Sequence, residues 1–274
     1  MLIGSVVSPT MKQVIPVGFE PIIKEDGDNK NDCERNCAKR WLSLFRKAHP
    51  HLPTILVADG LYSNAPFIRA AKEKKCSYIL VAKEKDHKYL CDYFWCADEE
   101  DSTSFELYPK GKKQKYRFMN SVPLNESNHD LKVNVLYFEE YDIKKEKTRK
   151  WMWVTDIEIT RNNAKFIMEG GRARWKIENE TFNTLKNQGY NFEHNFGHGY
   201  NGLSNLFAAI MLLAFLIDQV VEAVNIDFQA ALNKCRTRSG LFRDAQIYFT
   251  TFRFSSYRRL YDVMINGPPE WGVL

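Results

Sequence analysis

Glu178 is the acidic residue whose sequence surroundings point most directly to chemistry. It lies in the stretch Gly170–His198, whose central part reads RARWKIENETFNTLKNQ. A helix over this part would place Trp175, Phe182 and Leu185 on one stripe. Glu178 falls inside the same stripe, so the pattern predicts a carboxylate on an apolar face.

A carboxylate in that position is costly unless something neutralises it. Arg174 lies one turn before Glu178 on the same face and could form a structural ion pair with it. A divalent cation could serve instead, and both alternatives stay open on this pattern alone. Glu180 points to the other side of the predicted helix, so the periodicity selects Glu178 as the inward carboxylate.

Asp59 is the second candidate, because it follows the short apolar run TILVA at residues 54–58. Such a run is typical of a strand buried on both faces. Ligands of open α/β sheets bind at the carboxyl ends of the strands. The alternative is that Asp59 and Gly60 simply form a turn, in which both residue types are common.

An aspartate at a strand end and a glutamate on a later helix favour phosphodiester chemistry. Two or three carboxylates can hold two Mg²⁺ ions about 4 Å apart. One ion activates the attacking water or 3′-hydroxyl, and the other stabilises the leaving oxygen. Mg²⁺ prefers carboxylate ligands and keeps several waters, and Mn²⁺ is the alternative ion.

The elements that must position these residues follow from hydrophobic patterning. We expect a hairpin from residues 2–7 and 14–20, then a helix to about Ala48 that Asn31 or Asp32 caps. Residues 54–58, 63–75 and 77–82 predict a β-α-β unit, so its two strands should be parallel. Residues 83–160 predict a β-rich insertion, in which Cys91 and Cys96 would lie in a strand region. Residues 203–224 predict a strongly apolar, buried helix.

Composition limits the classes of protein. The chain has 274 residues, 44% of them hydrophobic, and a formal net charge of +5, so it can bury a sizeable core and is mildly basic. Its six cysteines form no Cys-x-x-Cys pair, which favours reduced, cytosolic thiols over a zinc site. We see no signal peptide, and the longest apolar run, Leu206 to Ile217, is shorter than the roughly 20 residues that span a bilayer. We therefore expect a cytoplasmic protein with no membrane partner.

Three further patterns each allow two interpretations. Lysines and an arginine alternate with aromatic residues over 108–118, and six arginines do so over 235–259. Both segments suit a nucleic-acid backbone, but the first could be a solvated strand face and the second a surface helix with inward aromatics. His194 and His198 lie among glycines, which favours a loop over a metal-binding helix.

The runs LVADGLYSNAPFI and RARWKIENETFNTLKNQGYNFEH resemble the DDE transposases of bacterial insertion sequences, of the insertion-sequence-four-like type that carries a Tyr-Arg-Glu-Lys signature. The resemblance implies a ribonuclease-H-like mixed sheet with a β-rich insertion before the last catalytic helix. It implies that Asp59 is the second catalytic Asp and Glu178 the catalytic Glu, both binding Mg²⁺. Arg174 would be the signature Arg, and Lys186 the signature Lys that contacts DNA phosphate.

The same resemblance implies three segments in this chain. Residues 1–86 would form a partial ribonuclease-H-like core, and residues 87–160 the β-rich insertion. Residues 161–274 would supply the catalytic-Glu helix and a C-terminal helical region that completes the core.

The chain departs from the family pattern in three places. Gly171 occupies the position of the signature Tyr, and Lys186 lies one residue further from Glu178 than the common spacing. No strand that ends in the family's first catalytic Asp precedes the predicted hairpin. Asp26, Asp28 and Asp32 fall in the loop after it, so we expect an N-terminally truncated domain whose first strand is missing.

We therefore predict a transposase catalytic domain for Mg²⁺-dependent DNA cleavage and strand transfer, inactive on its own. Its partners would be DNA, as transposon ends and target, and a second copy in a homodimer. The alternatives are a non-catalytic DNA-binding regulator or relic fragment, a nuclease of the same fold, and a structural protein without a nucleic-acid role.

Overall fold

The computed structural model of the chain describes residues 1–98, 100–194 and 202–268. These residues fall into two compact units. The first unit comprises Met1–Ile3 and Gly18–Arg174, and the second comprises Gly4–Val17 and Trp175–Leu274. Each unit is described below by itself.

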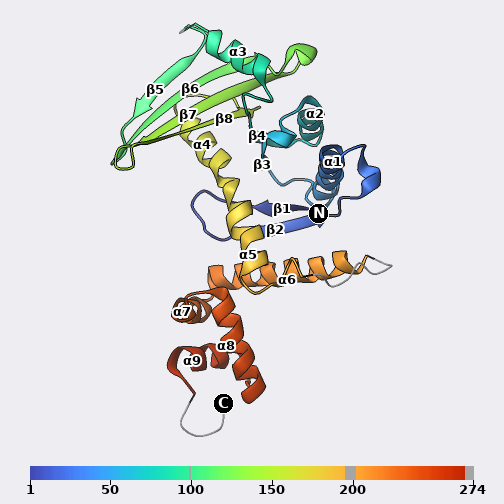
Figure 1. Ribbon diagram of the computed structural model, residues 1–274, viewed down its shortest axis with the longest axis vertical. Coiled ribbons are helices and arrows are strands. Elements are labelled where there is room, and N and C mark those ends of the chain that lie inside the picture. Colours follow the sequence, from blue (N-terminus) through green and yellow to red (C-terminus); the bar gives the residue numbers. More distant parts are fainter. Residues whose placement is uncertain (99, 195–201, 269–274) are drawn as a thin grey trace. The chain divides into compact units, whose positions relative to one another are not determined.

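A six-stranded mixed sheet organises the first unit (Figure 1). Its order is β3-β4-β8-β7-β6-β5. The bounds are β3 (Ile55–Ala58), β4 (Ser77–Val81), β5 (Thr103–Leu107), β6 (Lys112–Pro123), β7 (Lys132–Asp142) and β8 (Lys147–Thr155). β3 and β4 are parallel and the other neighbours are antiparallel, which confirms the predicted β-α-β unit and the mixed α/β class.

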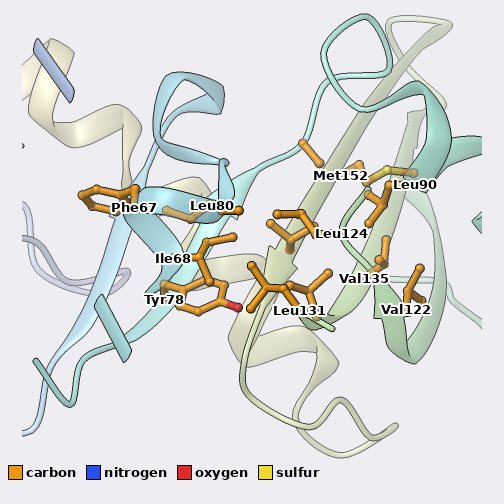
Figure 2. Close-up of a cluster of buried hydrophobic side chains, with 14 of the residues drawn as sticks. Phe67, Ile68, Tyr78, Leu80, Leu90, Val122, Leu124, Leu131, Val135 and Met152 are labelled. Atoms are coloured by element: carbon orange, nitrogen blue, oxygen red, sulfur yellow. The ribbon is translucent and has the colours of Figure 1, made fainter. Parts of the chain in front are cut away.

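Helices cover both faces of this sheet because its strands alternate their side chains between two cores. One core combines Tyr78 and Leu80 of β4 with residues of α1 (Lys30–Ala48), α2 (Ala65–Glu73) and α3 (Lys88–Cys96). Figure 2 shows this cluster, in which Phe67 and Ile68 of α2 lie near Tyr78 and Leu80. The other core combines Ile79, between those two residues, with α4 (Ala164–Ala173).

The segment predicted as a β-rich insertion contains β5–β8, as expected, but it begins with a helix. Cys91 and Cys96 lie on α3, so their predicted place in a strand is wrong. Leu90, Cys91 and Phe94 are the buried residues of α3, a spacing of three to four that is helical rather than alternating. β8 pairs directly with β4, so the insertion and the β-α-β unit share one sheet.

β3 is an edge strand, in contrast to the predicted strand buried on both faces. Its side chains are half-buried or exposed, and Ile55 has an exposed fraction of 39%. Among the described residues, β3 has a strand partner on one side only. The apolar run predicts the strand, but its composition does not show that this strand lies at the edge of the sheet formed by the described residues.

β1 (Leu2–Val6) and β2 (Ile15–Glu20) form a separate two-stranded sheet, which confirms the predicted hairpin. The division between the two units passes through both strands. Short 3-10 turns η1 (Lys24–Asp26), η2 (Gly60–Tyr62) and η3 (Glu126–Asn128) connect the larger elements.

The second unit is helical apart from residues 4–17. Its elements are the π-helix η4 (Ile177–Phe182), α5 (Asn183–Asn187), α6 (Leu203–Val224), α7 (Ile226–Cys235), α8 (Arg238–Thr251) and α9 (Tyr257–Asn266). Phe228, Leu241 and Leu260 join α7, α8 and α9 in one buried cluster. By length and composition alone, α6 is long and apolar enough to cross a membrane. The sequence analysis considered only the shorter run Leu206 to Ile217, which falls below that length.

Candidate metal and DNA site

Asp59 directly follows β3, at the carboxyl end of the parallel pair β3–β4. Its Oδ1 accepts a hydrogen bond of 3.0 Å from the backbone N–H of Leu61, which caps the turn η2. The turn interpretation is therefore correct for one carboxylate oxygen. Oδ2 of Asp59 has no hydrogen bond or ion pair with any described residue, so it is available to a ligand.

Tyr62 and Glu34 lie next to Asp59, and sequence patterning did not select either of them. The Tyr62 hydroxyl donates a 2.8 Å hydrogen bond to Glu34 Oε1. Burial raises the pKa of Tyr62, and the hydrogen bond to Glu34 and the charges of Glu34 and Asp59 raise it further. Tyr62 thus remains a neutral donor between two carboxylates. The sequence feature that could have drawn attention to Tyr62 is its place three positions after Asp59.

Glu178 lies on the π-helix η4, and its side chain is exposed. Trp175 is also exposed, with an exposed fraction of 57%. The predicted burial is therefore wrong for Trp175 and for the carboxylate of Glu178, whereas Leu185 of the same stripe is buried as expected. A π-helix bonds i to i+5 and so rotates successive side chains by less than an α-helix does. The residues of this segment that face inward are Thr181, Thr184 and Leu185.

The two residues expected to contact DNA lie on either side of η4. Arg174 ends α4 in the first unit and is half-buried. Lys186 lies on α5 in the second unit, where its Nζ forms a 2.5 Å ion pair with Glu193 Oε1. Both partners are substantially exposed, so solvent weakens this pair and a phosphate could replace the Glu193 carboxylate.

The four predicted site residues are divided between the units: Asp59 and Arg174 belong to the first, and Glu178 and Lys186 to the second. The convergence of Asp59 and Glu178 on metal ions stays a prediction. Within the part of the chain that the structure describes, no three metal-binding side chains form a cluster. The donor types nevertheless suit Mg²⁺, because one carboxylate has an open oxygen and the other is solvent-exposed.

The second unit contains a polar pocket of about 640 Å³ that sequence patterning did not find. Its lining includes three residues of the stretch Gly170–His198, namely Asn179, Glu180 and Asn183. Lys12 and Arg236 also line it. Asn179 and Asn183 are four residues apart, so a helix places them on one face. This spacing is the sequence feature that could have indicated a polar pocket lining. Amide and cationic groups around one hollow suit a phosphate or a nucleobase edge.

Most cations of the lysine-rich segment around β6 are already paired. Lys112 Nζ lies 3.1 Å from Glu140, and Lys113 Nζ lies 3.0 Å from Glu106. Arg117 lies over the Phe94 ring, with its guanidinium carbon 5.0 Å from the centroid. These contacts favour the interpretation of β6 as a solvated, internally paired strand face.

The arginines of the C-terminal segment differ from one another. Arg238 pairs with the buried Glu222, and Arg258 lies 3.7 Å from Asp227. Arg236, Arg253 and Arg259 form no ion pair with the residues that the structure describes. His198, considered with His194 from the sequence, lies outside the described residues.

A six-stranded mixed sheet with helices on both faces defines a protein of the mixed α/β class. The family model described as the transposase DDE domain matches residues 8–216, a span that includes Asp59, Arg174, Glu178 and Lys186. The chain belongs to this family. Its membership implies DNA as the substrate, and divalent metal ions are general in the family. A search of curated proteins found no match.

Proposed function

We propose that the chain is a transposase catalytic domain in which Asp59 and Glu178 together bind Mg²⁺ or Mn²⁺ for cleavage and joining of DNA. The observation that carries this proposal is the family match, which spans both residues and the insertion between them. The bound ions would supply an activated oxygen nucleophile and would stabilise the leaving oxygen. The insertion-sequence-four-like assignment and a cytoplasmic location are part of the same proposal.

The chain's own residues have separate tasks in this account. The Leu61 N–H holds Oδ1 of Asp59 and so directs Oδ2 away from the turn. Lys186 exchanges Glu193 for a DNA phosphate, and Arg174 supplies a second cation beside the motif. Because cation–phosphate contacts release counterions, binding should weaken steeply with salt.

We further propose that this chain has little or no transposition activity alone, because no third metal-binding side chain forms a cluster with Asp59 or Glu178 among the residues that the structure describes. Two of the three acids considered from the sequence are engaged in local structure: Asp26 binds the Ile23 N–H and Arg40, and Asp32, on α1, lies 3.7 Å from Arg35. The open edge of β3 also supports this proposal, because a further strand could pair there.

A nicking assay on supercoiled plasmid tests the activity. We expect no Mg²⁺- or Mn²⁺-dependent nicking above a no-protein control. Strong nicking that Asp59→Asn and Glu178→Gln both abolish would contradict the proposed inactivity while supporting the assigned ligands. Nicking without joining to an added 3′-hydroxyl end would indicate a nuclease instead.

A DNA-binding regulator is the second candidate function. It is favoured by Arg236, Arg253 and Arg259, which form no ion pair with the described residues. Salt-dependent DNA binding that is unaffected by Glu178→Gln and by added Mn²⁺ would favour this function over catalysis.

A further inference from the structure

The polar pocket of the second unit lies wholly within that unit. The described residues that line its volume of about 640 Å³ all belong to Gly4–Val17 or Trp175–Leu274. Apart from Leu232, these lining residues carry polar side chains. A hollow of this size can hold a small organic molecule, and its walls suit a polar molecule rather than an apolar one. The polar groups that lack a partner therefore indicate what the pocket can bind.

Gln219 of α6 supplies a buried hydrogen-bond donor to the pocket that it lines. The residue has an exposed fraction of only 3%. Its Oε1 accepts the Val14 N–H at 3.0 Å, so the orientation of the amide is fixed and Nε2 carries the donors. Nε2 donates to no residue that the structure describes. A buried donor without an acceptor is costly, and an acceptor oxygen on a bound molecule would remove that cost.

The N-terminus of α8 opens on the same pocket. Its N-cap, Thr237, and its first residue, Arg238, both line the pocket. The Thr237 hydroxyl accepts the Gly240 N–H, whereas the N–H groups of Arg238 and Ser239 donate to no described residue. The free N–H groups and the dipole of this 14-residue helix favour a negatively charged group at this end.

The Arg238 side chain adds further donors. Its Nη2 pairs with the carboxylate of Glu222 on α6. Its Nη1 is buried and forms no hydrogen bond within the described part of the chain. Glu222 thus balances the charge of Arg238 without using all the N–H groups of the guanidinium, which can donate to an oxyanion as well.

The charges of the lining are positive in sum. Lys12, Arg236 and Arg238 face two carboxylates, Glu180 and Glu222. Lys12 and Arg236 are exposed and form no ion pair with a described residue. Glu180 is half-buried and is the carboxylate that no cation of the described lining neutralises. Unused donors together with a positive balance suit an anion with several acceptor oxygens.

We propose that this pocket binds a phosphate group, held by the N-terminus of α8, Gln219 and Arg236. The phosphate is either free or part of DNA, because both present the same oxygens to the same donors. The binding needs neither Asp59 nor a metal ion, so it is independent of the proposed catalysis. Only a DNA source for the phosphate rests on the proposed function.

Calorimetric titration of the full chain with inorganic phosphate tests the site. EDTA is present, so a failure here is distinguishable from a failure of the metal site, and chloride keeps the ionic strength constant. Arg236→Gln should weaken phosphate binding about tenfold, as the loss of a charge-assisted hydrogen bond does. Glu180→Gln should tighten it, because a repelling charge is removed. Arg253→Gln is the matched control: Arg253 is also exposed and forms no ion pair with a described residue, but it does not line the pocket.

Gln219→Glu tests the buried donor. It keeps an oxygen that can accept the Val14 N–H and replaces Nε2 by a second carboxylate oxygen. This variant should abolish phosphate binding, and circular dichroism checks that it keeps its helices. If it does not fold, Arg236→Gln and Glu180→Gln, which alter less buried side chains, decide the outcome.

Fluorescence anisotropy of labelled DNA, again in EDTA, distinguishes the two sources. If DNA supplies the phosphate, inorganic phosphate competes with DNA more strongly than chloride of equal ionic strength, and Arg236→Gln reduces the salt dependence by about one phosphate contact. If free phosphate is the ligand, Arg236→Gln weakens phosphate binding and leaves DNA affinity unchanged. The proposal is overturned if neither phosphate nor DNA binding responds to Arg236→Gln and Glu180→Gln, or if Arg253→Gln has the same effect as Arg236→Gln.

Discussion

Gly171 of α4 lies directly against the indole of Trp153 in β8. A Cβ atom at position 171 would stand 2.5 Å from Trp153 Nε1 and 2.6 Å from Cε2, closer than real side chains approach. Trp153 is almost fully buried and rigid, so it cannot move aside easily. The glycine that replaces the expected signature tyrosine is therefore required by the packing of α4 on the sheet.

Gly171→Ala should lower the free energy of unfolding by about 1–3 kcal/mol, as overpacking of a core does. Gly171→Tyr should prevent stable folding of the first unit. Gly170→Ala is the matched control, because its Cβ would meet only the flexible end of Ile79 at 3.1 Å, and alanine improves helix propensity. Urea denaturation of the three proteins measures this. Equal stability of both alanine variants would contradict the packing argument.

Glu140 of β7 carries a buried charge, with only 1% of its side chain exposed. Lys112, Arg149 and Arg172 lie within 3.1, 3.0 and 3.8 Å of its carboxylate, and Gln114 donates a 3.0 Å hydrogen bond. Burial alone would raise the pKa of Glu140, but the hydrogen bonds of Gln114 and Lys112 and the nearby cations outweigh burial and lower it.

The lowered pKa of Glu140 sets the direction of a pH effect. Its contribution to stability is complete above the unfolded-state pKa of about 4.3 and is lost as the pH falls through the lower folded-state pKa. Glu140→Gln should cost about 1–3 kcal/mol at neutral pH, and the difference from wild type should shrink below about pH 4. Glu139→Gln, on the half-exposed pair with Lys150, should cost under about 1 kcal/mol. A pH-independent difference for Glu140→Gln would contradict this assignment.

Asp59 has two separable roles in this account, since Oδ1 caps a turn and Oδ2 is proposed to bind metal. Asp59→Asn keeps an oxygen that can accept from the Leu61 N–H, so it should retain thermal stability and lose Mn²⁺ affinity. Asp59→Ala should lose both, with a stability cost of about 0.5–2 kcal/mol. Thermal melts with and without Mn²⁺ separate the two effects. Retained Mn²⁺ stabilisation in Asp59→Asn would refute the ligand role.

Lys186 is expected to leave Glu193 when DNA binds. Glu193→Gln should therefore strengthen DNA binding, and Lys186→Gln should weaken it and reduce the salt dependence by about one phosphate contact. Lys165→Gln is the matched control, because it removes the same positive charge from an exposed lysine on α4. Fluorescence anisotropy of labelled DNA over a salt series measures all three. An unchanged salt slope in Lys186→Gln would place the phosphate contact elsewhere.

The strands and the β-α-β unit could be predicted because their apolar runs are local signals. The predicted N-cap of α1, Asn31 or Asp32, lies two or three residues after the observed N-cap. Asn29 caps it by accepting from the backbone N–H groups of Asn31 and Asp32, the residues proposed as caps. A polar loop rich in Asn and Asp offers several capping residues, and only the backbone selects one.

The burial of the residues around Glu178 was harder to predict, because part of this stretch is a π-helix. An α-helical period assigns Trp175 and Glu178 to a buried face, but both are exposed, and Glu178 lies on the π-helix η4, where that period does not hold. No residue type between Lys176 and Phe182 specifies that π-helix. α6 likewise reads as a uniformly apolar helix, and only the structure shows which of its residues are buried, Ala208, Leu212 and Phe215 among them.

The central claim is that Asp59 and Glu178 bind the same metal site, although 118 intervening residues separate them. A double-mutant cycle of Mn²⁺ affinity, measured by calorimetry on the wild type, Asp59→Asn, Glu178→Gln and the double variant, tests it most directly. Each single variant should weaken binding about as much as the double variant does, because either change removes a ligand from one shared site. Additive effects, or Mn²⁺ affinity that neither substitution alters, would contradict the account.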